Sequence, residues 1–136
     1  MTTYGERPFR TIATGMRVAS AEDYRTMLGR ARARSAQIAN ATSAPDEMPS
    51  DAVYLASSDG TRGLGIMPDG TLIGLYSTVR GSGDALVRTA VAHGAVALDC
   101  FDGYLPTLYA RHGFRETRRE ANWTPGAPDV VYMALV

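Results

Sequence analysis

The residues with the clearest chemical potential form a glycine-rich turn, Arg80-Gly81-Ser82-Gly83, directly before a segment of helical periodicity. The start of a helix carries unpaired backbone N–H groups and the positive end of the helix dipole, which together favour an anion. The glycines would let a pyrophosphate approach the main chain, and Arg80 would add a charged donor. Asp84 either caps the helix or, if it points inward, opposes a bound phosphate. A Gly-x-Gly before a helix also fits an ordinary helix start, so the turn needs support from elsewhere in the chain.

A second segment of interest begins sixteen residues beyond Gly83, where Asp99 interrupts an apolar run and Asp102 follows it. A carboxyl group buried in apolar surroundings would have a raised pKa and could act as a general base. His93 and Asp129 are further candidates, and for all four a helix cap or a solvated surface group is the simpler interpretation. The sequence therefore does not identify a base.

Other reactive groups are few. Cys100 lies in no obvious motif with either histidine and is better explained as a small apolar core residue than as a nucleophile. No Cys/His cluster has metal-ligand spacing, and neither a nucleotide phosphate loop nor a serine nucleophile elbow is present, so we expect no metal.

The N-terminal part of the chain must supply at least one helix. Ser20 provides an N-cap acceptor with the acidic Asp23 three residues on. Residues then recur at steps of three and four to form an apolar stripe: Tyr24, Met27, Leu28, Ala31, Ser35 and Ile38. This pattern predicts one helix that ends near Asn40, followed by a loop over residues 42–51. The short apolar stretches at 11–13 and 16–18 suit an edge strand.

The remaining elements alternate in a way that predicts a mixed sheet. Turns around Gly60 and Gly70 separate three short strands of an antiparallel meander. The helix after Gly83 should end at Gly94, and a helix near residues 104–112 should end at Gly113. The predicted strands span residues 52–56, 64–67, 72–77, 95–101, 114–120 and 130–135. We expect the strand at 95–101 to be buried.

Composition narrows the function classes. The chain has 136 residues, 45% apolar and 21% charged, with 14 basic and 14 acidic residues. With balanced charges, the protein has no overall positive potential that would attract nucleic acid or an anionic membrane. We interpret the arginines at 30, 32 and 34 and at 115, 118 and 119 as solvated. A single cysteine, no secretory leader and no long apolar run favour one domain in the cytoplasm.

The stretch from Ile73 to Phe114 resembles the cofactor-binding half of the GNAT superfamily of N-acetyltransferases. In that family a strand ends in a splayed turn with a Gly-x-Gly or Gly-x-Ala pattern before a helix, the place that Gly81 to Gly83 occupy. A later helix carries Leu-Tyr, three residues and Gly-Phe, which Leu108-Tyr109 and Gly113-Phe114 match. The resemblance covers roughly residues 52–136. Residues 98–103 and 122–133 further resemble a branch that is associated with bacteriophages and mobile elements.

The resemblance implies an α/β fold, an α+β mixed sheet of about six or seven strands with helices on both faces, in a single domain over residues 1–136. Residues 1–51 would form the acceptor side and 52–136 the cofactor-binding half. It implies transfer of an acetyl group from acetyl-CoA to an amine, carried by a small molecule or a protein, by direct attack, with Tyr109 as the general acid. The implied cofactor-binding residues are Leu75, Tyr76, Ser77, Arg80, Gly81, Ser82, Gly83, Asp84, Ala85, Asp102 and Tyr109.

Departures from the family pattern keep an alternative open. Thr78 stands where Gln or Arg is usual, and Asp102 stands where Asn is usual. A non-catalytic GNAT-fold module that binds or assembles with a partner is the competing hypothesis. Trp123, in the turn-rich segment before the last strand, has three open roles: part of an acceptor pocket, a contact in a homodimer, or a cover for the core.

Overall fold

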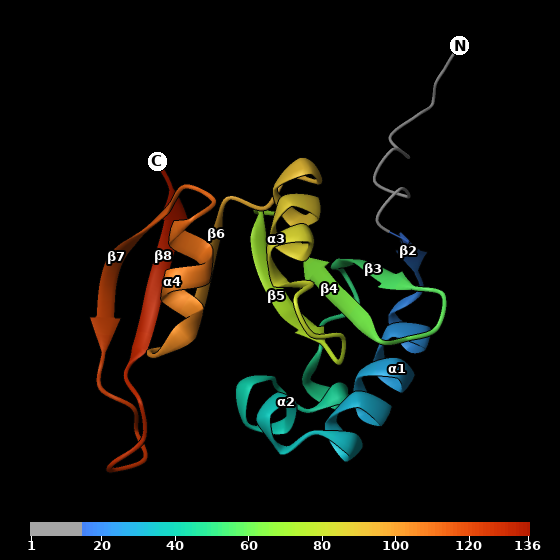
Figure 1. The fold of residues 1–136 in the computed structure, drawn as a ribbon, viewed down its shortest axis with the longest axis horizontal. Helices are drawn as coiled ribbons and strands as arrows, with labels where there is room; N and C mark the ends of the chain where they lie inside the picture. The colour runs from blue at the N-terminus through green and yellow to red at the C-terminus, as the bar shows by residue number, and fades with distance from the viewer. Residues whose placement is uncertain (1–14) are drawn as a thin grey trace.

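The computed structural model describes residues 15–136, which form one seven-stranded mixed sheet with helices on both faces (Figure 1). The order across the sheet is β2-β3-β4-β5-β6-β8-β7, and among these pairs only β5 and β6 are parallel. A short 3₁₀ turn covers Pro45–Glu47. The elements are β2 (Met16–Ala19), α1 (Ala21–Arg34), α2 (Ala36–Ala41), β3 (Val53–Ser57), β4 (Arg62–Ile66), β5 (Thr71–Ser77), α3 (Gly83–Ala92), β6 (Ala97–Phe101), α4 (Tyr104–Ala110), β7 (Phe114–Glu120) and β8 (Val130–Leu135).

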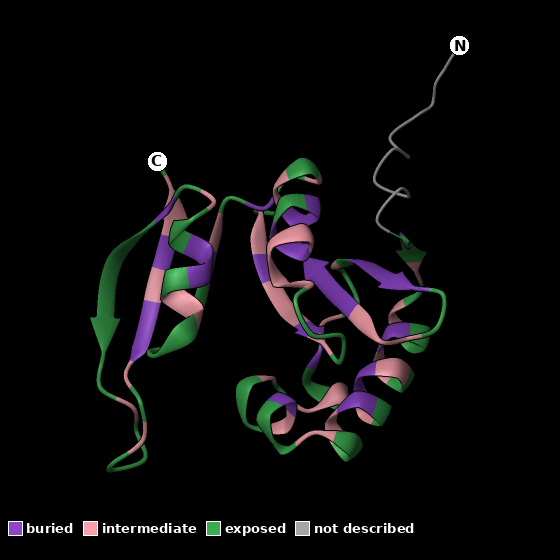
Figure 2. Cartoon of the chain, viewed as in Figure 1, coloured by how far each residue is buried: buried purple, intermediate pink, exposed green. Residues whose placement is uncertain are grey.

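Two apolar clusters lie on opposite faces of the sheet. Alternating residues of a strand point to opposite faces, so Leu72 of β5 joins the cluster under α3 and α4, whereas Ile73 packs against the cluster under α1 and α2. Figure 2 shows that buried residues follow the central strands and the inner sides of the helices, while β7 is exposed along almost all of its length. The mixed sheet with helices on both faces confirms the predicted fold class.

The strand predictions agree closely with the structure, and the antiparallel meander of β3, β4 and β5 is present. Edge strand β2 covers the apolar stretch at 16–18, whereas the stretch at 11–13 lies outside the described residues. The bounds predicted for β7 and β8 match the structure. Gly60, Gly70, Gly94 and Gly113 all have positive φ angles at the predicted turns and caps.

The prediction of a single helix up to Asn40 was wrong. Ser20 caps α1 as expected, because its hydroxyl accepts a hydrogen bond from the Asp23 N–H. At Ser35 the chain becomes extended, with φ −139° and ψ 112°, and the Ser35 hydroxyl accepts from the Ile38 N–H to begin α2. The three- and four-residue spacing continues through Ser35, so the spacing alone did not reveal that this serine ends α1 and caps α2.

The prediction of a buried strand at 95–101 was only half right. Leu98 is buried and Cys100 packs against the cluster under α4, but Asp99 is exposed on the other face. Helix α1 packs on β3 and β4, and on the far face of β6 Asp99 is exposed between the half-buried Ala97 and Phe101. A single apolar face therefore defines this strand.

A bulge in β5 shapes the middle of the sheet. Gly63 pairs with Tyr76 and Gly65 with Ile73, so Gly74 and Leu75 together oppose one residue of β4. Gly74 has φ +58°, and its carbonyl accepts a 2.5 Å hydrogen bond from the Tyr24 hydroxyl. The Tyr24 ring stacks on Tyr54 at 4.2 Å between centroids. These contacts connect α1 to the strand that leads into the glycine-rich turn.

Candidate active site

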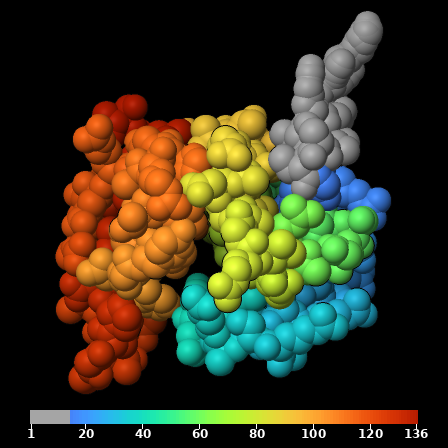
Figure 3. Space-filling model, viewed as in Figure 1, coloured from blue at the N-terminus to red at the C-terminus, as the bar shows by residue number. Residues whose placement is uncertain are grey.

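The sheet opens between its two parallel strands. Strands β5 and β6 pair only at Thr71 with Ala97 and Leu72 with Leu98, although β5 continues to Ser77. Among the strands of residues 15–136, β5 therefore has a partner from Ile73 onward on the β4 side alone. Figure 3 shows the surface hollowed between the part of the chain around α4 and the part around the start of α3. An extended molecule could pair with the free edge of β5 as an added strand.

The glycine-rich turn lies at the end of that free edge. The Ser77 hydroxyl lies 2.5 Å from the Ser82 hydroxyl, and Ser82 donates to the Val79 carbonyl, so the two serines hold the turn together. Helix α3 starts after Ser82, and no side chain of the described residues accepts a hydrogen bond from its first N–H groups. Arg80 is exposed and has no partner among the residues that the structure describes. The first turn of α3 is thus free to receive an anion.

The two glycines of the turn serve different purposes. Gly81 has φ +81°, and a side chain at this position would meet nothing within 4 Å, so the space beyond it is open. A β-carbon at Gly83 would lie 3.2 Å from the Leu108 side chain. The absent side chain of Gly83 therefore allows α3 and α4 to approach each other, while that of Gly81 leaves the turn accessible.

The carboxylate of Asp84 points toward α4. It accepts hydrogen bonds from the Arg111 side chain at 3.2 Å and lies 2.7 Å from Nε2 of His112. The hydrogen bond from Arg111, followed by that from His112, holds the pKa of Asp84 below its ordinary value. The positive charge of Arg111 offsets the negative charge of Asp84, so Asp84 repels a bound phosphate less strongly. The same contact connects the start of α3 to the end of α4.

Tyr109 lies under α4 with only 5% of its surface exposed. Its ring meets Phe114 edge-on at 5.9 Å between centroids. Burial raises the pKa of Tyr109 above its ordinary value, and the neighbouring Cys100 and Asp99 of β6 raise it further. The phenol therefore keeps its proton at neutral pH. Its hydroxyl makes no hydrogen bond within residues 15–136.

The predicted cofactor residue Asp102 is engaged elsewhere. It accepts a hydrogen bond from Arg119 at 2.8 Å, which, ahead of the bond from the Gly103 N–H, lowers the pKa of Asp102. Arg119 also binds Glu116 and lies 3.4 Å from Asp129. This network joins the end of β6 to β7, on the side of β6 away from β5, so the charge of Asp102 is paired.

The other predicted groups divide into engaged and free ones. Leu75 packs toward α3 and α4, whereas Tyr76 is buried toward α1 and donates to the Gly60 carbonyl at 3.0 Å. His93 contacts the Thr89 carbonyl at the end of α3. Of the four candidate bases, Asp99 is the one whose carboxylate makes no hydrogen bond or ion pair among the described residues.

The structure argues against a nucleophilic role for Cys100 and against a core role for Trp123. Burial, followed by Asp99 and Asp102, raises the pKa of Cys100 to about 12, which disfavours a thiolate nucleophile. Trp123 is 82% exposed in the loop between β7 and β8 and does not cover the core. Residues 15–136 contain no group of three or more His, Cys, Asp or Glu side chains placed to bind a metal, and no helix among them is long and apolar enough to cross a membrane.

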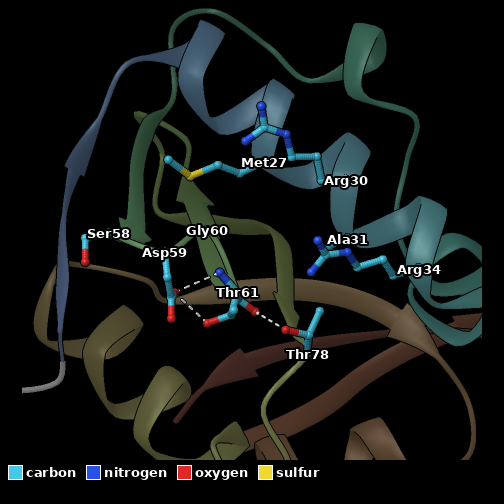
Figure 4. Close-up of a pocket in the computed structure, with 9 residues that line it drawn as sticks. All are labelled: Met27, Arg30, Ala31, Arg34, Ser58, Asp59, Gly60, Thr61 and Thr78. Atoms are coloured by element: carbon cyan, nitrogen blue, oxygen red, sulfur yellow. Dashed lines mark hydrogen bonds between the residues drawn. The ribbon is translucent and has the colours of Figure 1, made fainter.

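Sequence reasoning missed a pocket on the α1 side of the sheet. It has a volume of about 160 Å³ and lies between the last turns of α1 and the turn that joins β3 to β4 (Figure 4). Asp59 forms that turn: Ser57 and Thr61 hydroxyls and the Thr61 N–H all donate to one of its oxygens. The Ser-Asp-Gly turn was visible in the sequence, but its position opposite the arginines of α1 depends on tertiary packing.

The turn at Asp59 should make folding sensitive to acid. Hydrogen bonds from Thr61, then Ser57, lower the pKa of Asp59 to about 2 from an ordinary 3.8. A carboxyl with a depressed folded-state pKa stabilises the fold above its unfolded-state pKa, and this contribution is lost as pH falls from about 4 to about 2. We expect the melting temperature to fall less between pH 5 and pH 2 in Asp59→Asn than in the wild type. Asp46→Asn, which removes a carboxyl elsewhere, is the control. An equal fall in melting temperature in Asp59→Asn and in the wild type would contradict this role of Asp59.

Comparisons with known proteins support the fold. No protein-family model matches the chain, and no curated protein matches it in sequence. Among solved structures, a match is the crystal structure of a "putative N-acetyltransferase" from Lactobacillus plantarum, with a TM-score of 0.54 and 18% sequence identity over 88% of this chain and 97% of that one. At this identity the similarity concerns the fold, so the conclusion is that the chain has a GNAT-type fold.

Proposed function

We propose that the protein transfers an acetyl group from acetyl-CoA to an amine. The observation that carries the proposal is the parting of β5 and β6 after two paired residues, next to a helix start that has no cap. The free edge of β5 at Gly74 to Ser77 would pair with the pantetheine arm, and the first N–H groups of α3 would bind the pyrophosphate. Arg80 would add a charged donor beside this site.

In this proposal Tyr109 protonates the leaving group. The amine nitrogen forms a bond to the thioester carbon, the carbon–sulfur bond breaks, and the sulfur takes the phenol proton, which solvent then restores. Tyrosine is protonated at neutral pH even at its ordinary pKa, so Tyr109 enters the reaction as a proton donor, and the raised pKa makes it a weaker acid than an exposed phenol. The resemblance of Leu108-Tyr109 and Gly113-Phe114 to the family motif supports the same role.

We further propose Asp99 as the group that receives the proton of the amine. Asp99 faces away from the cluster that contains Tyr109, because its neighbours Leu98 and Cys100 point into that cluster. An acid and a base on opposite faces of one opening suit a direct attack, in which the nucleophile and the leaving group lie on different sides of the carbonyl. The exposure of Asp99 gives an amine access to its carboxylate.

The alternative is a GNAT-fold module that binds a partner without catalysis. The ion pair of Asp102 with Arg119 favours this alternative. Asp102 stands at a position of the family motif, but here it connects β6 to β7. Exposed Trp123 would then be a contact site for a partner or for a second copy of the chain. The two functions differ in whether acetyl-CoA binds.

The proposal predicts that acetyl-CoA raises the melting temperature. A ligand that binds only the folded state, at a hundredfold excess over its Kd, stabilises by about 2.7 kcal/mol, which corresponds to several degrees. Gly81→Val should abolish the shift, because the side chain would enter the open space in front of the turn. Gly94→Val, with φ +100° and equally open surroundings at the other end of α3, is the matched control for backbone strain. An unchanged shift in Gly81→Val would place the ligand elsewhere.

A further inference from the structure

The pocket between α1 and the β3–β4 turn carries a separate inference. Its volume of about 160 Å³ leaves room for a small charged group between α1 and the turn. Thr78, the first residue after β5, forms part of its wall. The pocket thus lies at the end of β5 that leads into the glycine-rich turn, on the face covered by α1.

Two exposed arginines of α1 line the pocket. Arg30 and Arg34 are one helical turn apart, and neither makes a hydrogen bond or an ion pair within residues 15–136. In Figure 4 the Arg34 side chain extends from α1 toward Thr61 and Thr78. Arg32, between them in sequence, instead bonds the carbonyls of Ala39, Thr42 and Ser43. In the same view the Arg30 side chain extends away from Thr61 and Thr78, beside Met27, so the two arginines line the pocket in different directions.

The acidic residue of the pocket, Asp59, makes no ion pair with either arginine among the described residues. Hydrogen bonds from Thr61 and Ser57, and more weakly the charge of Arg62, lower its pKa. Asp59 keeps its negative charge, so an anion in the pocket would have to lie closer to the guanidinium groups than to this carboxylate. Two positive side chains at i and i+4 repel each other, so an anion between them would relieve this repulsion. Guanidinium groups match the planar oxygens of carboxylates and phosphates through paired N–H donors.

We propose that this pocket binds an oxyanion, a phosphate or a carboxylate, through Arg30 and Arg34. The anion would belong either to the acceptor molecule or to the 3′-phosphate of the coenzyme. The assignment of the pocket as an anion site stands apart from acetyl transfer, whereas the identity of the molecule that carries the anion rests on the proposed function.

Inorganic phosphate is the first probe, with melting temperature measured at low, matched ionic strength. We expect saturable stabilisation of the wild type, and an apparent Kd that rises about tenfold or more in Arg34→Gln and in Arg30→Gln. Each variant is compared with its own phosphate-free protein, since Arg34 also lies in the last turn of α1. Arg115→Gln removes an exposed arginine of β7 that makes no hydrogen bond or ion pair with the other described residues. It is the charge-matched control and should keep the wild-type response.

A second pair of probes identifies the source of the anion. If the pocket takes the coenzyme, acetyl-CoA should bind the wild type more tightly than its 3′-dephospho form, and this difference should vanish in Arg34→Gln. If it takes the acceptor, both forms should bind alike and phosphate should still bind the coenzyme-saturated protein. Phosphate binding without binding of either coenzyme form would refute acetyl transfer and leave the anion site standing. The inference would be overturned if phosphate does not raise the melting temperature of the wild type, or if it stabilises Arg30→Gln and Arg34→Gln as it stabilises the wild type.

Discussion

Replacement of Tyr109 by phenylalanine is expected to slow acetyl transfer by about a hundredfold to ten-thousandfold, the usual contribution of a general acid. Cofactor affinity and stability should stay close to those of the wild type. The ring that packs on Phe114 is retained, and the hydroxyl that is lost makes no hydrogen bond within the described residues. The measurement is single-turnover transfer to an amine that the wild type acetylates, which isolates the chemical step.

Tyr104→Phe is the matched control for this experiment. Tyr104 lies at the start of the same helix, is 64% exposed, and its hydroxyl receives a hydrogen bond from Arg111. Its replacement removes a phenolic hydroxyl from α4 without affecting the buried position. If Tyr109→Phe transfers the acetyl group at the wild-type rate when chemistry limits turnover, Tyr109 is a core residue and the general acid must be sought elsewhere.

The largest effect on stability is expected for Gly74→Val in the bulge of β5. A β-carbon there would lie 2.1 Å from the Tyr24 hydroxyl oxygen and 2.6 Å from the Met48 methyl group, at a φ of +58°. Backbone strain of about 1–3 kcal/mol and overpacking of about 1–3 kcal/mol add to a loss of roughly 2–6 kcal/mol in the free energy of unfolding. Denaturant titration measures this loss.

Gly126→Val separates the clash from the strain. Gly126 has φ +85° and no atom within 4 Å of a β-carbon, so it should suffer strain alone. An equal loss in both variants would show that the contacts of the bulge with α1 contribute little. A larger loss in Gly74→Val would establish that Tyr24 and the bulge fix the position of the β5 edge that the cofactor is proposed to use.

The sequence predicted elements whose signals are local. The cap at Ser20 and the strands β7 and β8 follow from capping residues and from alternation. The break at Ser35 was missed because Ser35 fits the three- and four-residue spacing of the apolar stripe. A serine followed three residues later by a buried isoleucine is compatible with a continuous helix and with a new N-cap, and apolar periodicity does not separate them.

Features of the site that depend on tertiary contacts were beyond the sequence. Asp84 meets Arg111 and His112, and Asp102 meets Arg119, across 17 or more positions of the chain. The arginines at 30 and 34 are exposed, as the sequence predicted, but nothing local in the sequence places the β3–β4 turn opposite them. The roles of Tyr109 and of the glycine turn, and the association with a phage-related branch, stay predictions that rest on the resemblance.

Calorimetric titration with acetyl-CoA tests the central claim most directly, because both the cofactor site and the transfer reaction require this binding. The proposal predicts saturable binding of one molecule per chain that Gly81→Val abolishes and Gly94→Val retains. Titrations at two temperatures guard against an enthalpy near zero at one of them. Absence of binding to the wild type at millimolar acetyl-CoA at both temperatures would contradict the proposal and favour a GNAT-fold module without catalysis.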